Sequence, residues 1–172
     1  GSLLEGMQLN TSGYLGIGTS SPANKLHVYS GASGVASPGT NGALIIENSA
    51  GAFLQFATPN TATSGIFFGD PENLTSGGIF YDHSSNYLRF DTATAEQMRL
   101  NSSGNLGLGV TPSAWGGTNK ALDINTIGNL SADTTTLRIV YNGYSDTGGT
   151  FRYKTSTSAF VYIQSNAIGH AW

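Results

Sequence analysis

The feature that most constrains this 172-residue sequence is an internal repeat. The string MQLNTSGYLGIGTSSPANKLHV, residues 7–28, returns in altered form as MRLNSSGNLGLGVTPSAWGGTNKALDI, residues 98–124. Met7 then falls on Met98, and the alignment is interrupted only by a short insertion around Trp115. Chance does not give ordered matches over such a length, so the two stretches are copies of one structural element.

The repeat predicts two β units, residues 3–97 and residues 98–172, the second of them truncated. Gly1-Ser2 resembles a cloning scar, and the chain stops abruptly at Trp172. We therefore expect the sequence to be a fragment of something longer.

Local patterns predict short β-strands throughout. Segments rich in aromatic and β-branched residues alternate with clusters of Gly, Asn, Asp, Ser and Pro. The expected strands are 25–28, 43–46, 53–56, 66–68, 79–81, 87–90, 137–141, 151–153 and 160–163. Two hairpins are expected, 79–90 with its turn at 82–86 and 151–163 with its turn at 155–158. A helical turn or two is predicted only at 92–98.

The composition excludes several classes of protein. Charged residues make up 10% of the chain, against about 25% in ordinary soluble domains, but eight Phe and eight Tyr argue against disorder. The net charge of −3 and the scattered Lys and Arg residues provide no basic patch, so neither nucleic acid nor an anionic membrane is an expected partner. The absence of cysteine excludes disulfides and thiolate metal sites. No apolar run approaches the roughly 18–20 residues of a membrane helix, so no membrane insertion is expected.

Short strands such as these have little apolar surface to bury within one chain. The run Gly65-Ile66-Phe67-Phe68-Gly69 is apolar on both faces of a strand, so a sheet with one face in water would expose half of it. Neighbouring copies of the chain could cover the second face and form a core between subunits around an axis. The side chains expected to line that core alternate with glycines in the two copies of the repeat: Leu15, Ile17, Leu106 and Leu108.

Several of these stretches resemble a known family. MRLNSSGNLGLG at 98–109 is similar to the repeated element of tailed-bacteriophage tail fibres and tailspikes, as is YLGIGTSSP at 14–22 followed by KLHV at 25–28. Such elements are common in proteins that end in an endosialidase-type intramolecular chaperone. YDHSSNYLRF at 81–90 resembles the segment that often precedes the element there.

The resemblance implies an elongated, homotrimeric virion fibre, assembled in the bacterial host cytoplasm, that links the virion to the host surface. Its implied partners are copies of itself, adjoining fibre segments and host cell-surface polysaccharide. The chaperone domain with its self-cleavage serine is not visible in this sequence, so no protease activity is carried over. The predicted fold is all-β: an elongated, repeat-containing, intertwined homotrimeric fibre similar to a β-prism or triple β-helix. A monomeric β-sandwich is the alternative.

No catalytic constellation stands out. Asp82-His83-Ser84 has the letters of a catalytic triad, but triads are assembled from distant positions, and a hairpin turn uses the same residues for backbone hydrogen bonds. His27, His83 and His170 lack metal-ligand spacing. One His27 from each of three chains could hold an axial metal, although a packed or surface histidine is the commoner situation.

Carboxylate pairs could support glycoside hydrolysis across a groove. Asp70 and Glu72 flank a proline in a loop, and Asp82 and Asp91 lie near hairpin ends, where carboxylates usually cap turns. We therefore predict no enzyme activity, no catalytic residue, no metal and no cofactor.

Aromatic side chains are the better candidates for binding, because exposed rings stack on sugars while neighbouring polar groups bond the hydroxyls. Trp115, in the insertion, is expected to project from the shaft, and two tyrosine pairs border turns or loops. The candidate glycan contacts are Trp115, Tyr81, Tyr87, Tyr141 and Tyr144. The alternative is that these rings pack between chains.

The sequence thus predicts a structural and adhesive fibre segment that takes part in host-surface attachment. A glycan-binding receptor-recognition module is the first alternative. A fragment of a polysaccharide depolymerase is the second.

Overall fold

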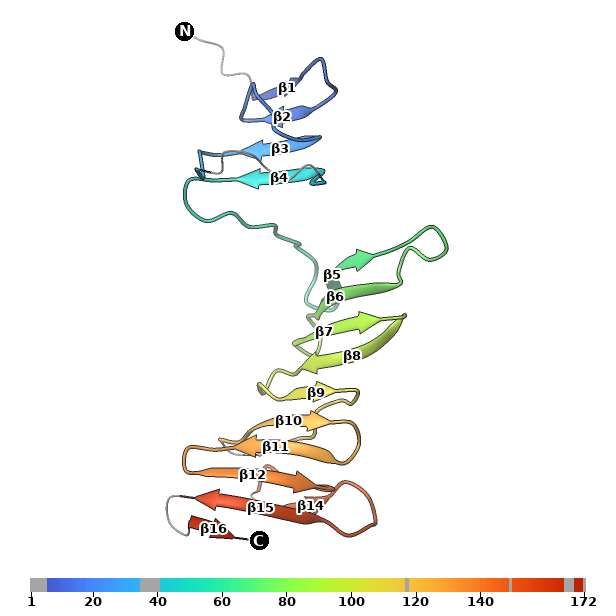
Figure 1. Cartoon of the computed structure of the whole chain (residues 1–172), viewed down its shortest axis with the longest axis vertical. Coiled ribbons are helices and arrows are strands. Elements are labelled where there is room, and N and C mark those ends of the chain that lie inside the picture. Colours follow the sequence, from blue (N-terminus) through green and yellow to red (C-terminus); the bar gives the residue numbers. More distant parts are fainter. Residues whose placement is uncertain (1–5, 35–40, 117, 149, 166–168, 172) are drawn as a thin grey trace. The chain divides into compact units, whose positions relative to one another are not determined.

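The computed structural model describes residues 6–34, 41–116, 118–148, 150–165 and 169–171. This part of the chain is all-β, with strands β1 to β16 and no helix (Figure 1). It therefore contains no helix long and apolar enough to cross a membrane. The predicted cloning scar and the C-terminal tryptophan lie outside the described residues.

The chain divides into two compact units, Gly1–Gln55 and Phe56–Trp172. The boundary predicted from the repeat, between residues 97 and 98, falls inside β8 (Ala95–Leu100). β8 is paired to a strand on each side, so one sheet continues across the start of the second copy. The sequence repeat corresponds to a recurring group of strands. The compact units instead correspond to the separate sheets.

The first unit is a four-stranded sheet in the order β1-β2-β3-β4. Its strands are β1 (Met7–Leu9), β2 (Leu15–Ile17), β3 (Leu26–Tyr29) and β4 (Leu44–Glu47). β1 and β2 are antiparallel, and the other two pairings are parallel.

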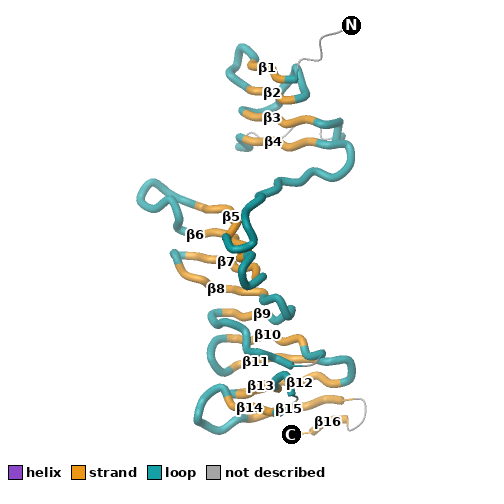
Figure 2. The backbone as a smooth tube through the Cα atoms, turned by 180° about the vertical axis from the view of Figure 1, so that it is seen from behind, coloured by secondary structure: helices purple, strands orange, loops and turns teal. Residues whose placement is uncertain are grey.

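The second unit is a ten-stranded sheet in the order β16-β15-β12-β11-β10-β9-β8-β7-β6-β5. All its pairings are antiparallel except that of β9 with β10. Besides β8, its strands are β5 (Thr63–Phe68), β6 (Gly77–Asp82), β7 (Tyr87–Thr92), β9 (Leu106–Leu108), β10 (Lys120–Ile124), β11 (Gly128–Ala132), β12 (Thr136–Tyr141), β15 (Phe160–Ser165) and β16 (Gly169–Ala171). A separate pair, β13 (Gly143–Ser145) and β14 (Phe151–Tyr153), completes the unit (Figure 2).

Two local predictions are wrong. The expected helix at 92–98 is the turn from β7 into β8, because Ala93 and Thr94 take φ angles of +49° and +63°, which a right-handed helix cannot use. Pairing with two neighbouring strands then satisfies the backbone of β8. The expected strand at 53–56 belongs to no sheet.

One predicted hairpin is confirmed and the other is wrong. β6 and β7 pair from Gly77 to Thr92 and turn as expected at 83–86. In the 151–163 segment, however, β14 pairs with β13 and β15 pairs with β12. The cause is Asn142, which is fully buried: its Oδ1 accepts from Thr155 N–H at 2.8 Å, and its Nδ2 donates to Thr157 O at 2.8 Å. These bonds hold the intervening loop and send its two flanking strands to different partners.

The two sequence copies fold alike where they begin. Asn10 Oδ1 accepts hydrogen bonds from the N–H groups of Ser12 (3.0 Å) and Tyr14 (2.9 Å). Asn101 Oδ1 does the same with the N–H groups two and four residues later, at 3.0 and 2.9 Å. Each asparagine side chain therefore closes the turn between the first two strands of its copy.

Glycine is required in the second strand of each copy by a close approach of the backbone. A Cβ on Gly16 would lie 2.3 Å from the carbonyl oxygen of Thr19. A Cβ on Gly107 would lie 2.0 Å from that of Val110. After each of these strands the chain turns back over its glycine, which covers that side of the strand.

One face of the first sheet is entirely apolar. Residues directly opposite one another in neighbouring strands share a face. This face, called here the Leu15 face, consists of Met7, Leu9, Leu15, Ile17, Leu26, Val28, Leu44 and Ile46. Met7 and Leu9 are 67% and 69% exposed, so the unit leaves this face uncovered.

The ten-stranded sheet has a matching face, called here the Leu106 face. It consists mainly of Ile66, Phe68, Ile79, Tyr81, Leu88, Phe90, Met98, Leu100, Leu106, Leu108, Leu122, Ile124, Leu130, Leu137, Ile139, Tyr141, Phe160 and Tyr162. Its polar members lie at or near strand ends: Ser64, Thr92, Lys120 and Gln164. Many of the apolar members are more than one third exposed, including Ile139 at 54%.

The small core of the second unit lies on the opposite side of the sheet. Trp115, Ala121 and Val140 form its buried cluster, with Tyr144 and Val161 packed against it. The Phe80 side chain is buried as well. Because no second sheet of this unit covers the Leu106 face, the alternative prediction of a β-sandwich is wrong for the described part of this unit.

Turn carboxylates fix the ends of several strands, and Asp133 is the most strongly perturbed. Its side chain accepts from the N–H groups of Thr135 (2.8 Å) and Thr136 (2.9 Å), and Arg138 Nη1 lies 3.0 Å away. The backbone bond from Thr135, followed by that from Arg138, lowers the pKa of Asp133 from 3.8 to about 2.

This lowered pKa predicts a stability loss in acid. A group whose pKa is lower in the folded protein contributes stability above its ordinary pKa and loses it as the pH falls to the folded value. We expect wild-type protein to lose more unfolding free energy between pH 4 and pH 2 than Asp133→Asn, measured by urea unfolding at each pH. Glu72→Gln, which removes a carboxylate from an exposed loop, is the control. Equal pH dependence of Asp133→Asn and wild type would contradict the prediction.

Candidate functional site

The four side chains predicted to line a core between subunits all lie on the two uncovered apolar faces. Leu15 and Ile17 belong to the Leu15 face, and Leu106 and Leu108 to the Leu106 face. The register is the same in both copies, because Leu9 opposes Leu15 as Leu100 opposes Leu106. The structure places these residues on uncovered surfaces, and their place in a core between chains remains a prediction.

Trp115 does not project from the sheet as expected. It is only 5% exposed, and its Nε1–H donates to Asp123 Oδ1 at 3.0 Å. Tyr144 contacts it edge to face with ring centroids 6.0 Å apart. Neither face of the indole is therefore free to stack on a sugar, and the ring packs within the chain rather than between chains.

The tyrosine candidates do not form one site. Tyr81 and Tyr141 lie on the Leu106 face, at strands far apart in the sheet order. Tyr87 lies on the opposite face, where the guanidinium carbon of Arg99 stands 3.9 Å from its ring centroid. The structure brings together only the candidates Trp115 and Tyr144, and it buries that pair's tryptophan.

Asp123 is the most enclosed charged group of the described chain. It has no exposed surface and accepts hydrogen bonds from Trp115 Nε1 and from Ser113 N–H at 2.7 Å. Lys154 Nζ lies 3.1 Å from Asp123 Oδ2, an ion-pair distance, although its geometry does not meet hydrogen-bond criteria. We assign this cluster a structural role, because all three contacts of Asp123 serve to anchor loops over the sheet.

His27 occupies the position of the first sheet that corresponds to Asp123. Gly16 opposes His27 as Gly107 opposes Asp123. His27 is buried, its Nδ1 accepts from Ala23 N–H at 3.3 Å, and its Nε2 lies 3.1 Å from Glu47 Oε2. Because Nδ1 accepts, Nε2 carries the proton that is donated to Glu47. His27 is therefore a packed histidine, and both of its nitrogens are engaged within the chain.

The Asp82-His83-Ser84 stretch is a turn and not a triad. Asp82 Oδ1 accepts from Ser84 Oγ at 2.7 Å and from Ser85 N–H at 2.8 Å. The bond from Ser84, followed by that from Ser85, lowers the pKa of Asp82 below its usual value. The His83 side chain instead contacts the neighbouring strand, where its Nε2 lies 3.3 Å from Ser64 Oγ.

Asp70 also caps a loop, as expected for a carboxylate beside a proline. Its Oδ1 accepts from the N–H groups of Glu72 (3.1 Å) and Asn73 (2.7 Å), and Ser76 Oγ donates to its Oδ2 at 2.9 Å. The bond from Ser76 is the largest cause of its lowered pKa. This carboxylate is committed to the loop by three hydrogen bonds.

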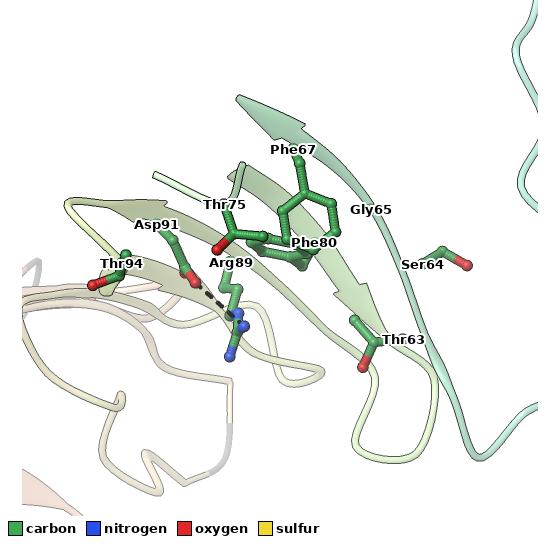
Figure 3. Close-up of a pocket in the computed structure, with 9 residues that line it drawn as sticks. All are labelled: Thr63, Ser64, Gly65, Phe67, Thr75, Phe80, Arg89, Asp91 and Thr94. Carbon is green, nitrogen blue, oxygen red and sulfur yellow. Dashed lines mark ion pairs between the residues drawn. The ribbon is translucent and has the colours of Figure 1, made fainter. Parts of the chain in front are cut away.

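A pocket that the sequence patterns did not indicate lies over β5, β6 and β7 (Figure 3). It has a volume of about 430 Å³ and is called here the Phe67 pocket. Its lining comprises two aromatic rings, an ion pair, four hydroxyl side chains and a glycine: Phe67, Phe80, Arg89, Asp91, Thr63, Ser64, Thr75, Thr94 and Gly65. The only sequence signal was alternation, which places Phe67 on the face opposite its neighbours Ile66 and Phe68.

Among the described residues, no group of three or more His, Asp or Glu side chains could hold a metal ion. Comparison of the chain with protein-family models, with curated proteins and with solved structures gives no match.

Proposed function

We propose that this chain is a structural and adhesive segment of a tail fibre or tailspike of a tailed bacteriophage. In this proposal three copies of the chain associate through their Leu15 and Leu106 faces, and adjoining fibre segments continue the assembly in the virion. The segment takes part in attachment to the host surface and has no catalytic role.

The observation that carries the proposal is the uncovered apolar face of each sheet. The chain exposes 11253 Å² of surface. Two compact units of these lengths sharing the 17.9 kDa mass would expose about 9,500 Å². The difference of about 1,700 Å², to which the exposed segment 51–61 outside the sheets also contributes, exceeds the roughly 800 Å² that each partner buries in an interface of standard size. Surface of this kind supports association with further chains.

The distribution of charge favours copies of the same chain as the occupant of the Leu106 face. The ion pairs of Arg89 with Asp91 and of Arg99 with Glu96 lie on the opposite side of the sheet. Copies that place their apolar faces together keep these charges in water. The proposed number of three chains in the assembly is taken from the resemblance to tail fibres.

The mass in solution tests this proposal. Light scattering on a size-exclusion column is expected to give three times the chain mass of 17.9 kDa, maintained on dilution through the micromolar range. A monomer would overturn the proposal, since the apolar faces would then be stable in water without a partner. A dimer would overturn the trimeric arrangement.

A further inference from the structure

The floor of the Phe67 pocket is built from a ring fixed over glycine. The Phe80 ring lies so close to the neighbouring strand β5 and to the backbone of its own strand β6 that a Cβ on Gly65 would be 2.4 Å from it and a Cβ on Gly78 2.3 Å. The guanidinium carbon of Arg89 lies 4.8 Å from the Phe80 ring centroid, and the Phe67 ring is 5.0 Å away, edge to face. The floor is therefore held in place before any ligand arrives.

Phe67 provides an exposed apolar wall beside this floor. It is 58% exposed near the end of β5, an edge strand of the sheet. Figure 3 shows its ring next to Phe80, above the Arg89 and Asp91 side chains. An exposed aromatic ring next to polar groups can stack against a ligand that has both an apolar face and hydroxyls.

The charged pair in the pocket is balanced and retains hydrogen-bonding capacity. Arg89 Nη2 lies 3.2 Å from Asp91 Oδ2, so the pair carries no net charge. Arg89 Nε and Asp91 Oδ1 have no hydrogen-bond partner within the described chain. Both atoms are enclosed, whereas the Arg89 side chain as a whole is about one third exposed. A ligand hydroxyl could accept from the exposed part of its guanidinium, which carries five N–H donors.

We propose that the Phe67 pocket binds one residue of a neutral carbohydrate. The apolar C–H face of the sugar ring stacks on Phe67, and its hydroxyls bond to Arg89 and the flanking Thr94. A balanced ion pair in an acidic protein gives no preference for an anionic ligand. The pocket volume falls in the range of small-ligand sites.

The location of the pocket is compatible with assembly of the chain. Phe67, Phe80 and Arg89 point away from the Leu106 face, because they alternate with its members along their strands. Association through the Leu106 face therefore leaves these three residues uncovered, and of the strand residues that line the pocket only Ser64 belongs to that face. The inference rests on the adhesive part of the proposed function, and it names the chemical class of the ligand.

The test is saturation-transfer NMR of the full chain with the methyl glycosides of glucose, galactose, mannose and N-acetylglucosamine. We expect at least one glycoside to receive saturation and to titrate to a plateau. Phe67→Ala is expected to weaken that binding by about tenfold. Tyr153→Ala is the matched control, because it removes another exposed aromatic ring, on β14, outside the pocket and should leave binding unchanged.

Arg89→Gln provides a second test that does not involve the aromatic wall and is likewise expected to weaken binding. No titratable binding of any of the four glycosides would overturn the inference, as would binding unaffected by both pocket substitutions. Light scattering on each NMR sample separates this result from the proposed assembly. A trimer that binds no glycoside would overturn only the proposed binding at the Phe67 pocket. A monomer that binds one would overturn only the proposed trimer.

Discussion

Ile139→Asp is expected to convert the proposed trimer into monomers. Ile139 lies on the Leu106 face in β12 and is 54% exposed in the single chain. In the isolated chain the substitution places a carboxylate in water, which costs little. In the assembly it buries an unpaired charge against apolar side chains, which costs several kcal/mol for each chain. Light scattering should therefore give one chain mass, while far-ultraviolet circular dichroism still reports β-structure.

Leu74→Asp is the matched control for this experiment. Leu74 is even more exposed, but it lies in the loop between β5 and β6 and not on either apolar face. The control variant should remain trimeric. Ile17→Asp makes the same test on the Leu15 face and shows whether the first unit also contributes. Trimers of wild-type stability in both face variants would exclude these faces as the interface.

Asp123→Ala is expected to cause the largest loss of stability of any single substitution proposed. It leaves the buried ammonium of Lys154 without its counter-charge and removes the acceptor of Trp115 Nε1 and Ser113 N–H. Removing one partner of a buried ion pair costs about 3–5 kcal/mol, equivalent to a fall in melting temperature of roughly 10–20 °C. Thermal unfolding followed by circular dichroism measures the change.

The double variant Asp123→Ala/Lys154→Met makes this prediction specific to charge. Because the second substitution removes the unpaired ammonium, the double variant should melt at a higher temperature than Asp123→Ala alone. Asp123→Asn, which keeps an acceptor for the indole N–H, should lie between wild type and Asp123→Ala. Additive losses in the double variant would show that the ion pair contributes nothing.

The sequence predicted those elements whose determinants are local. Alternation and turn residues identified the β6–β7 hairpin, and the repeat located the similar strand pairs that begin each copy. The second hairpin could not be predicted, because its loop is held by Asn142, which lies outside the predicted segment. The short helix at 92–98 was predicted from local residues typical of a helix start. Those residues do not reveal that β8 pairs with a strand on each side.

The binding candidates were harder to predict than the strands. Trp115 lies beside glycines in an insertion, which suggests exposure, but the acceptor for its indole N–H is Asp123 in the next strand. No local pattern encodes that contact. The Phe67 pocket depends on the register of three strands, which places Gly65, Phe80 and Arg89 in one row across the sheet. Register is set by the whole sheet, so a single segment does not reveal it.

The common opening of the two copies has a consequence for how such a chain can change its length. In each copy an antiparallel pair is followed by a parallel strand in the same register, and the turn is closed by an asparagine of the copy itself. The buried polar residue beside the glycine differs, His27 in one copy and Asp123 in the other, and their charged partners Glu47 and Lys154 lie further along the chain. Because each copy closes its own turn and sets its own register, a further copy would lengthen the chain by the same group of three strands.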